Sequence, residues 1–134
     1  MTNDVLEHTI VDTMFEAFKS QNLEQAVATV SDDTVWIHHG SQKLPSLRFE
    51  GKSGVTQFFA TNFNTMHVEY FDILKTTQQG DTIVVQGKEK FTIDGEEGFF
   101  AQKWVQIYTV KNGLITRMEE FATSVADEEY MVVA

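Results

Sequence analysis

The chain has 134 residues, of which 42% are hydrophobic, and it contains no Cys, so it can form neither a disulfide nor a thiolate metal site. Its 20 acidic and 10 basic residues give a formal net charge of −10, which disfavours binding to the phosphates of nucleic acids and of membrane surfaces. No apolar run approaches the ~18–20 residues that span a bilayer, and no signal peptide is visible, so we expect one cytoplasmic domain over 1–134.

The first half of the chain is predicted to be mainly helical. Apolar residues recur at helical spacing from about residue 3 to residue 20 and predict a first helix, after which Asn22 can cap a second, short one. The segment TVWIHH at 34–39 predicts a first strand. The stretch 40–51 contains the only proline and is expected to be irregular, and 53–63 (SGVTQFFATNF) predicts a third helix.

The second half of the chain is predicted to form a meander of long strands. Four β-rich runs are separated by turn signals at Gln79-Gly80-Asp81, Asp94-Gly95 and Lys111-Asn112-Gly113, a pattern typical of consecutive antiparallel hairpins. An acidic tail from about residue 125 is expected to be exposed. Helices followed by a meander predict an α+β domain in which the helices cover one face of a curved sheet.

One strand of this meander carries a carboxylate on its apolar face. Alternate side chains of a strand point the same way, and this puts Glu89 among the buried residues of the strand 83–91. A four-residue loop at 94–97 would pair Glu89 with Gln102, whereas a two-residue Asp94-Gly95 loop would shift the partners and keep the face. In both registers the residues that share this face on the next strand are Phe100, Gln102, Trp104, Gln106 and Tyr108.

The register of the last hairpin decides which residues of the final strand join this face. We favour a three-residue loop at 111–113, which places Trp104 opposite Glu120. A two-residue Asn112-Gly113 loop would instead turn the odd-numbered residues of 115–121 to that face, because a one-residue slip exchanges the two faces. The favoured register gives one face that bears, among apolar neighbours, Glu89, Gln102, Trp104, Gln106, Tyr108, Met118 and Glu120.

This face is too polar for a pure core and too aromatic for a solvent-exposed surface. Large apolar walls with a few converging polar groups are typical of a small-molecule pocket, and Phe18, Trp36 and Phe59 are expected to add to those walls. Two carboxyl groups in such a pocket raise each other's pKa, so that one can hold a proton near neutral pH. The alternatives are core packing for the aromatic residues, an ion pair or rim position for Glu89, and exposure for Glu120.

Two motifs, LRFEGKSGVTQFFA and WVQIYTVKNGLITRMEEFA, resemble the nuclear transport factor 2-like superfamily, in particular its SnoaL-like branch. The resemblance covers about Asp4 to Ser124. It implies a cone-shaped domain in which three N-terminal helices pack on a strongly curved, mainly antiparallel sheet and enclose a deep apolar pocket, commonly in a homodimer. Members include ketosteroid isomerase, polyketide cyclases, limonene-epoxide hydrolase, dehydratases and non-catalytic binding proteins.

The limonene-epoxide hydrolase pattern gives the most useful comparison within that superfamily. By its layout Trp36 and His38 stand at the Tyr and Asn places of the first strand, and Glu89 and Glu120 stand at the two Asp places. Gly87 stands where that family has an arginine between the acids, which argues against epoxide hydrolysis. The fold implies that the first strand neighbours the last, which would bring His38 near Glu120 as a proton shuttle.

The remaining charged residues predict no metal site and no cofactor. His39 must face away from His38, so this doublet cannot chelate one metal ion from a regular strand, and Gly-rich phosphate loops and nucleophile elbows are absent. The lysines Lys88, Lys90 and Lys103 belong to the opposite, outer face of the sheet. They are expected to solvate it or to pair with acids across a homodimer interface.

Two functional classes therefore remain open, and both need the same pocket. One is a cofactor-independent isomerase, cyclase or hydrolase that uses Glu120, His38 and Glu89 for general acid–base catalysis. The other is a non-catalytic protein that binds a small hydrophobic molecule, with a protein-interaction module as a third and weaker possibility.

Overall fold

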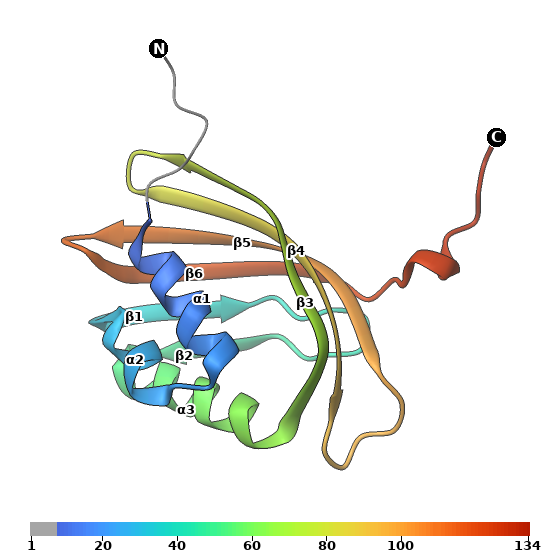
Figure 1. Ribbon diagram of the computed structural model, residues 1–134, viewed down its shortest axis with the longest axis horizontal. Coiled ribbons are helices and arrows are strands. Elements are labelled where there is room, and N and C mark those ends of the chain that lie inside the picture. The colour runs from blue at the N-terminus through green and yellow to red at the C-terminus, as the bar shows by residue number, and fades with distance from the viewer. Residues whose placement is uncertain (1–7) are drawn as a thin grey trace.

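The computed structural model describes residues 8–134, and in this part of the chain three α-helices pack on one six-stranded sheet (Figure 1). The helices are α1 (Ile10–Ser20), α2 (Leu23–Ala28) and α3 (Gly51–Thr65). The strands are β1 (Val30–His38), β2 (Leu47–Glu50), β3 (Met66–Gln79), β4 (Thr82–Ile93), β5 (Phe100–Lys111) and β6 (Leu114–Thr123), followed by a short 3-10 helix, η1 (Asp127–Glu129). The predicted α+β architecture, with helices on a curved sheet, is confirmed.

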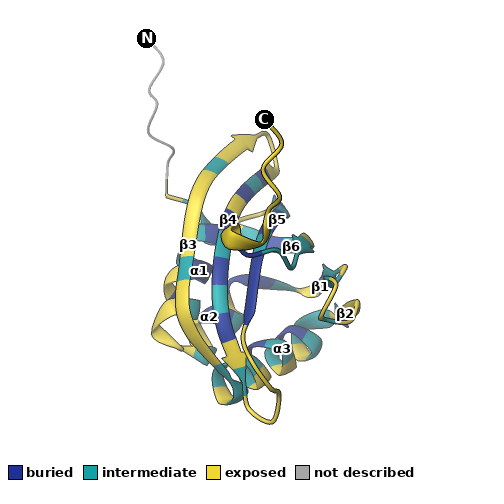
Figure 2. Ribbon diagram, turned by 90° about the vertical axis from the view of Figure 1, so that its right-hand side faces the viewer, coloured by how far each residue is buried: buried dark blue, intermediate teal, exposed yellow. Residues whose placement is uncertain are grey.

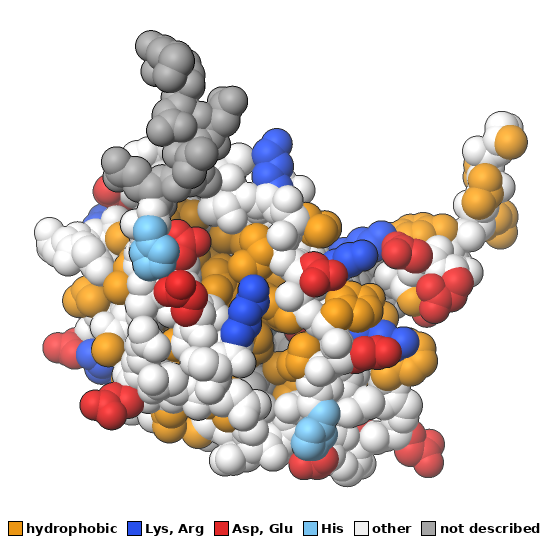
Figure 3. All heavy atoms as spheres, viewed as in Figure 1, with side chains coloured by type: hydrophobic (Ala, Val, Ile, Leu, Met, Phe, Trp, Pro, Cys, Tyr) orange, Lys and Arg blue, Asp and Glu red, His pale blue; other side chains and the backbone are white. Residues whose placement is uncertain are grey.

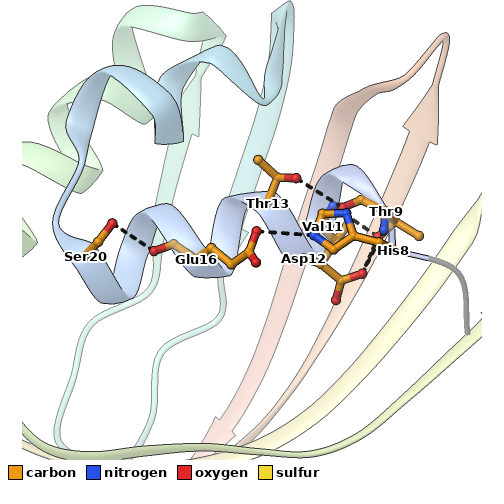
Figure 4. A network of polar contacts seen from close by, with 7 residues as sticks. All are labelled: His8, Thr9, Val11, Asp12, Thr13, Glu16 and Ser20. Carbon is orange, nitrogen blue, oxygen red and sulfur yellow. Dashed lines mark hydrogen bonds and ion pairs between the residues drawn. The ribbon is translucent and has the colours of Figure 1, made fainter.

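The first helix begins later than the apolar pattern predicts, because a capping box fixes its start (Figure 4). The backbone N–H of Val11 donates to the side chain of Thr9 at 3.2 Å, and the backbone N–H of Thr9 donates to the carboxylate of Asp12 at 2.8 Å. Gln21, in the left-handed region with φ 56°, ends the helix. The part of the predicted helix at residues 3–7 lies outside the described residues.

The sheet has the strand order β2-β1-β6-β5-β4-β3, and each neighbouring pair is antiparallel except β1 and β6, which run parallel. The helices cover one face of it, and the exposed strand β3 forms one edge (Figures 1 and 2). Within residues 8–134, no helix combines the length and the apolar character that a membrane crossing requires.

The β4–β5 hairpin has the register that the four-residue loop predicts. Glu89 lies opposite Gln102, and Gly87 lies opposite Trp104. The odd-numbered residues of β4 from Ile83 to Phe91 are all buried, so Glu89 does lie on the inner face of the sheet.

The predicted turn between β5 and β6 is wrong. Asn112 and Gly113 both have positive φ angles, 54° and 77°, and form a two-residue turn that pairs Lys111 with Leu114. Asn tolerates the left-handed conformation and Gly adopts it freely, which suits Asn-Gly to this tight turn.

A bulge in β6 then compensates for the difference between the predicted and the observed turn, so that Glu120 still lies on the predicted face of the sheet. The register shifts by one residue between Thr109 and Val110, so beyond the bulge the even-numbered residues from Met118 to Ala122 face the helices, while Ile115 is the buried residue before it. The partners differ from the prediction, because Glu120 lies opposite Gln106 and Trp104 lies opposite Ala122. Glu120 is only 7% exposed.

Candidate functional site

Four adjacent strands turn most of the sequence-predicted site residues toward the helices. Side chains two residues apart on a strand share a face, and the order β1-β6-β5-β4 places the four inner faces side by side. The residues brought together in this way are Trp36 and His38 of β1, Glu120 of β6, Gln102, Gln106 and Tyr108 of β5, and Glu89 of β4. As expected for β1 beside β6, His38 lies opposite Glu120.

A partly open cavity of about 390 Å³ lies between this part of the sheet and the helices. All seven of those residues line it, together with the predicted wall residues Phe18 of α1 and Phe59 of α3. The space-filling view shows hydrophobic side chains gathered in a hollow between the helices and the long strands (Figure 3). The cavity is therefore walled mainly by apolar side chains. Its two carboxyl groups lie on the sheet side, and α3 adds the polar residues Gln57, Thr61, Asn62 and Thr65.

Two of the predicted wall residues, Trp104 and Met118, do not line this cavity. Trp104 is 2% exposed and lies flat over Gly87, with its ring stacked on Phe71 at 5.2 Å and on Phe15 at 6.3 Å between centroids. Met118 is fully buried. Both side chains point to the helix side of the sheet as predicted, but other side chains cover them, so they belong to the hydrophobic core.

Gly87 has a definite steric role in this arrangement. A Cβ atom at position 87 would overlap the outer carbons of the Trp104 indole and would approach the carbonyl oxygen of Asp72 to 2.7 Å. The indole therefore occupies the space into which a longer side chain at 87 would extend.

Several cavity residues were not predicted from the sequence. They come from α1, α3, the segment between β1 and β2, and the sheet, and include Phe15, Leu44, Phe49, Asn62, Phe71, Phe91 and Ala122. Phe91 and Ala122 could have been found, because they continue the alternating faces of Glu89 and Glu120. Leu44 lies in an irregular segment whose sequence has no period that would predict its direction.

One carboxyl group of the cavity, Glu120, is held by a chain of side-chain hydrogen bonds along β5. Gln106 Nε2 donates to Glu120 Oε1 at 2.7 Å, and the hydroxyl of Tyr108 donates to Gln106 Oε1. Burial raises the pKa of Glu120, and the hydrogen bond from Gln106 opposes this shift. The phenol of Tyr108 stays protonated, because burial and the nearby Glu120 charge raise its pKa well above the ordinary value.

The second carboxyl group, Glu89, has the more strongly perturbed environment. It is 6% exposed and accepts a hydrogen bond from Gln102 Nε2 at 2.8 Å. Burial first, and then the charge of Glu120, raise the pKa of Glu89 to about 8, while the hydrogen bond from Gln102 acts in the opposite direction. Glu89 is therefore mostly protonated at neutral pH.

His38 completes the polar side of the cavity as a neutral imidazole. Its Nε2 lies 3.8 Å from Glu120 Oε2, too far for a hydrogen bond, and its ring stacks on Phe58 with centroids 4.7 Å apart. Burial and, after it, the neighbouring His39 lower the pKa of His38 to about 4. The buried His38 Nδ1 and Trp36 Nε1 have no hydrogen-bond partner among the described residues.

The outer face of the sheet carries different charged residues. His39 faces away from the cavity, and its Nε2 lies 2.6 Å from Glu119 Oε2. Lys90 and Lys103 pair with acids of the same chain, Glu69 at 3.2 Å and Asp127 at 2.7 Å. Within residues 8–134, no three His, Asp or Glu side chains are grouped closely enough to hold a metal ion.

Comparison with known proteins identifies the class of fold and then the family. The structure is similar to an NTF2-like protein from Burkholderia xenovorans LB400, with 20% sequence identity, coverage of 84% of this chain and 86% of that chain, and a TM-score of 0.74. It is also similar to a protein with a ketosteroid isomerase-like fold from Catenulispora acidiphila, solved in complex with trimethylamine (17% identity, 85% and 86% coverage, TM-score 0.71). A third relative is an LEH-like epoxide hydrolase from M. tuberculosis (14% identity, 83% and 77% coverage, TM-score 0.65).

The chain belongs to the SnoaL-like domain family, whose model matches residues 11–118. This match, together with the NTF2-like neighbours, confirms the superfamily and the SnoaL-like branch that the sequence motifs indicate. A search of curated protein sequences finds no match.

Proposed function

We propose that the protein binds a small, largely apolar molecule in the cavity and transfers a proton on that molecule without a cofactor. The observation that carries this proposal is the position of two buried carboxyl groups, Glu89 and Glu120, in one cavity with aromatic walls. Apolar clefts of this volume with a few converging polar groups are typical of small-molecule sites. Carboxyl groups with raised pKa values are suited to general acid–base catalysis near neutral pH.

Glu120 and His38 are the proposed proton-transfer groups. Gln106 holds one oxygen of Glu120, which leaves the oxygen nearer to His38 free to meet a bound molecule. His38 is neutral at physiological pH and can accept a proton when a bound molecule bridges it to Glu120. Glu89 keeps its own proton near pH 7 and can donate a hydrogen bond to an oxygen or nitrogen of the ligand.

Epoxide hydrolysis by the limonene-epoxide hydrolase arrangement is not the reaction that this site supports. The resemblance to that family calls for an arginine between the two acids, and Gly87 occupies that position. The Trp104 indole fills the space beside Gly87, so the sheet offers no room there for a guanidinium group. An isomerase or cyclase reaction, in which a proton is removed from one atom and returned to another, needs only the groups present.

Binding without catalysis is the second candidate function. The distance of 3.8 Å between His38 Nε2 and Glu120 Oε2 is longer than the hydrogen bond by which a carboxylate orients a catalytic imidazole. Glu89 and Glu120 would then serve only as polar contacts for a bound metabolite.

Native mass spectrometry of freshly purified protein tests the shared part of both candidates. We expect a retained small molecule in the wild type and its loss in Ala122→Phe, because residue 122 lines the cavity and the added ring would fill it. For the retained molecule, Glu120→Gln should abolish chemical conversion and preserve binding, while Glu119→Gln on the outer face changes neither. Equal loss of binding and conversion in Glu120→Gln would contradict a catalytic role and identify Glu120 as an anchor.

A further inference from the structure

The charge pattern of the cavity is one-sided. Among the described residues that line it, two are carboxylic acids, Glu89 and Glu120, and none is Lys or Arg. An anionic ligand would meet only acids and hydrogen-bonding groups there, with no opposite charge to compensate for its lost hydration. The site therefore selects against carboxylates, phosphates and sulfates.

The walls of the cavity offer a second feature that bears on ligand charge. Nine of the lining side chains are aromatic rings, namely Phe15, Phe18, Trp36, Phe49, Phe58, Phe59, Phe71, Phe91 and Tyr108. The faces of such rings carry partial negative charge and attract cations, most strongly where water is excluded. Several rings meet on the β1 side, where Trp36 lies 5.6 Å from Phe58 and 5.3 Å from Phe59 between centroids.

We propose that the ligand of this cavity is an organic cation, a tertiary or quaternary amine whose alkyl groups contact the aromatic walls and whose charge is balanced by Glu89 and Glu120. This inference rests on the proposed binding function and specifies its ligand class. The carboxyl groups stay on the sheet side of the cavity, held by Gln102 and Gln106, with one oxygen of each not engaged by those amides. The net charge of −10 also attracts a cation from a distance.

The same geometry predicts that cation binding releases a proton. Glu89 holds its proton in the empty site because burial and Glu120 disfavour its charge, and a bound ammonium group would reverse that preference. The other titratable groups around the cavity are Glu120 of β6, His38 of β1 and Tyr108 of β5. His38 is already neutral and Tyr108 stays protonated, whereas Glu120 would ionise in the same direction as Glu89.

Choline and its uncharged isostere 3,3-dimethylbutan-1-ol test this inference, because they share shape and hydroxyl and differ in charge. Isothermal titration calorimetry at pH 7 should show choline binding about tenfold more tightly, as expected for a cation in a desolvated aromatic site. Measurements in buffers of different ionisation enthalpy should show release of roughly one proton with choline and none with the isostere. Choline affinity should also rise by close to tenfold per pH unit between pH 5 and pH 7 and begin to level off near pH 8, where Glu89 of the empty site is already half ionised.

Single substitutions test whether Glu89 is responsible for the preference for choline over its uncharged isostere. Glu89→Gln should remove most of the preference for choline over the isostere, whereas Glu97→Gln, which changes an exposed acid of the β4–β5 loop, should leave the affinities for both probes unchanged. Equal or tighter binding of the isostere would overturn the inference. The inference would also be overturned if neither choline nor 3,3-dimethylbutan-1-ol binds to a protein that still binds the neutral fluorophore N-phenyl-1-naphthylamine. If that fluorophore also fails to bind, the proposed binding function itself is contradicted.

Discussion

Replacement of Glu89 by Gln should stabilise the protein at neutral pH and have little effect under acidic conditions. Gln has the same shape as a protonated Glu, cannot ionise, and can still accept the hydrogen bond from Gln102. In the wild type, the folded state keeps a proton on Glu89 that the unfolded chain gives up. The stability of the wild type therefore falls as the pH rises from about 4.5, the ordinary pKa, to about 8, the folded pKa.

The size of this effect follows from the two pKa values. The stability that the wild type loses because Glu89 stays protonated in the folded state is roughly 1 kcal/mol at pH 5 and roughly 3 kcal/mol at pH 7, since each pKa unit corresponds to about 1.4 kcal/mol. The difference in free energy of unfolding between Glu89→Gln and the wild type should therefore be larger at pH 7 than at pH 5 by roughly 2 kcal/mol, in favour of the variant.

Urea denaturation at pH 5, 6, 7 and 8 measures the difference directly. The matched control is Glu97→Gln, which removes one carboxylate from an exposed loop and should track the wild type at every pH. Parallel curves for Glu89→Gln and the wild type would refute the reasoning, because they would mean that Glu89 ionises equally easily in the folded and unfolded states.

Three further predictions concern other parts of the structure. Gly87→Ala should destabilise the fold by about 1–3 kcal/mol in urea denaturation, because the new methyl group overlaps the Trp104 indole; a change below about 0.5 kcal/mol would contradict the packing described here. The imidazole carbon resonances of His38 should show no titration between pH 5 and pH 8, and a midpoint near 6.5 would show that the ring is not buried. We also propose that two chains associate through the outer face of the sheet, where Phe121 is 47% exposed; sedimentation equilibrium should give twice the 15.3 kDa chain mass for the wild type and a single chain for Phe121→Glu.

Much of the fold could be predicted because local patterns and tertiary packing agree. The alternation around Glu89 predicted which side of β4 is buried. Of the two loop lengths considered, the four-residue loop gives the observed pairing of Glu89 with Gln102. The last hairpin was predicted less well, because a bulge at a single residue of β6 is not visible in the apolar pattern. The tighter Asn112-Gly113 turn and this bulge each shift the register by one residue, and together they leave Glu120 on the inner face of the sheet.

The candidate site could be predicted only as far as the direction of each side chain. Alternation along a strand showed that Trp104 and Trp36 both point toward the helices, but it could not show which of them the helices cover. The Trp104 indole packs over Gly87 and beneath Phe15, a contact between segments far apart in the chain. The perturbed pKa of Glu89 likewise depends on burial by the whole fold.

Fluorescence titration with N-phenyl-1-naphthylamine tests most directly whether the cavity accepts a small apolar molecule. We expect saturable enhancement of fluorescence with the wild type and its loss in Ala122→Phe, where an aromatic ring fills the cavity. Thr92→Phe, which adds the same ring at an exposed position of β4, should bind like the wild type. Equal enhancement with Ala122→Phe, or none with the wild type, would contradict the account.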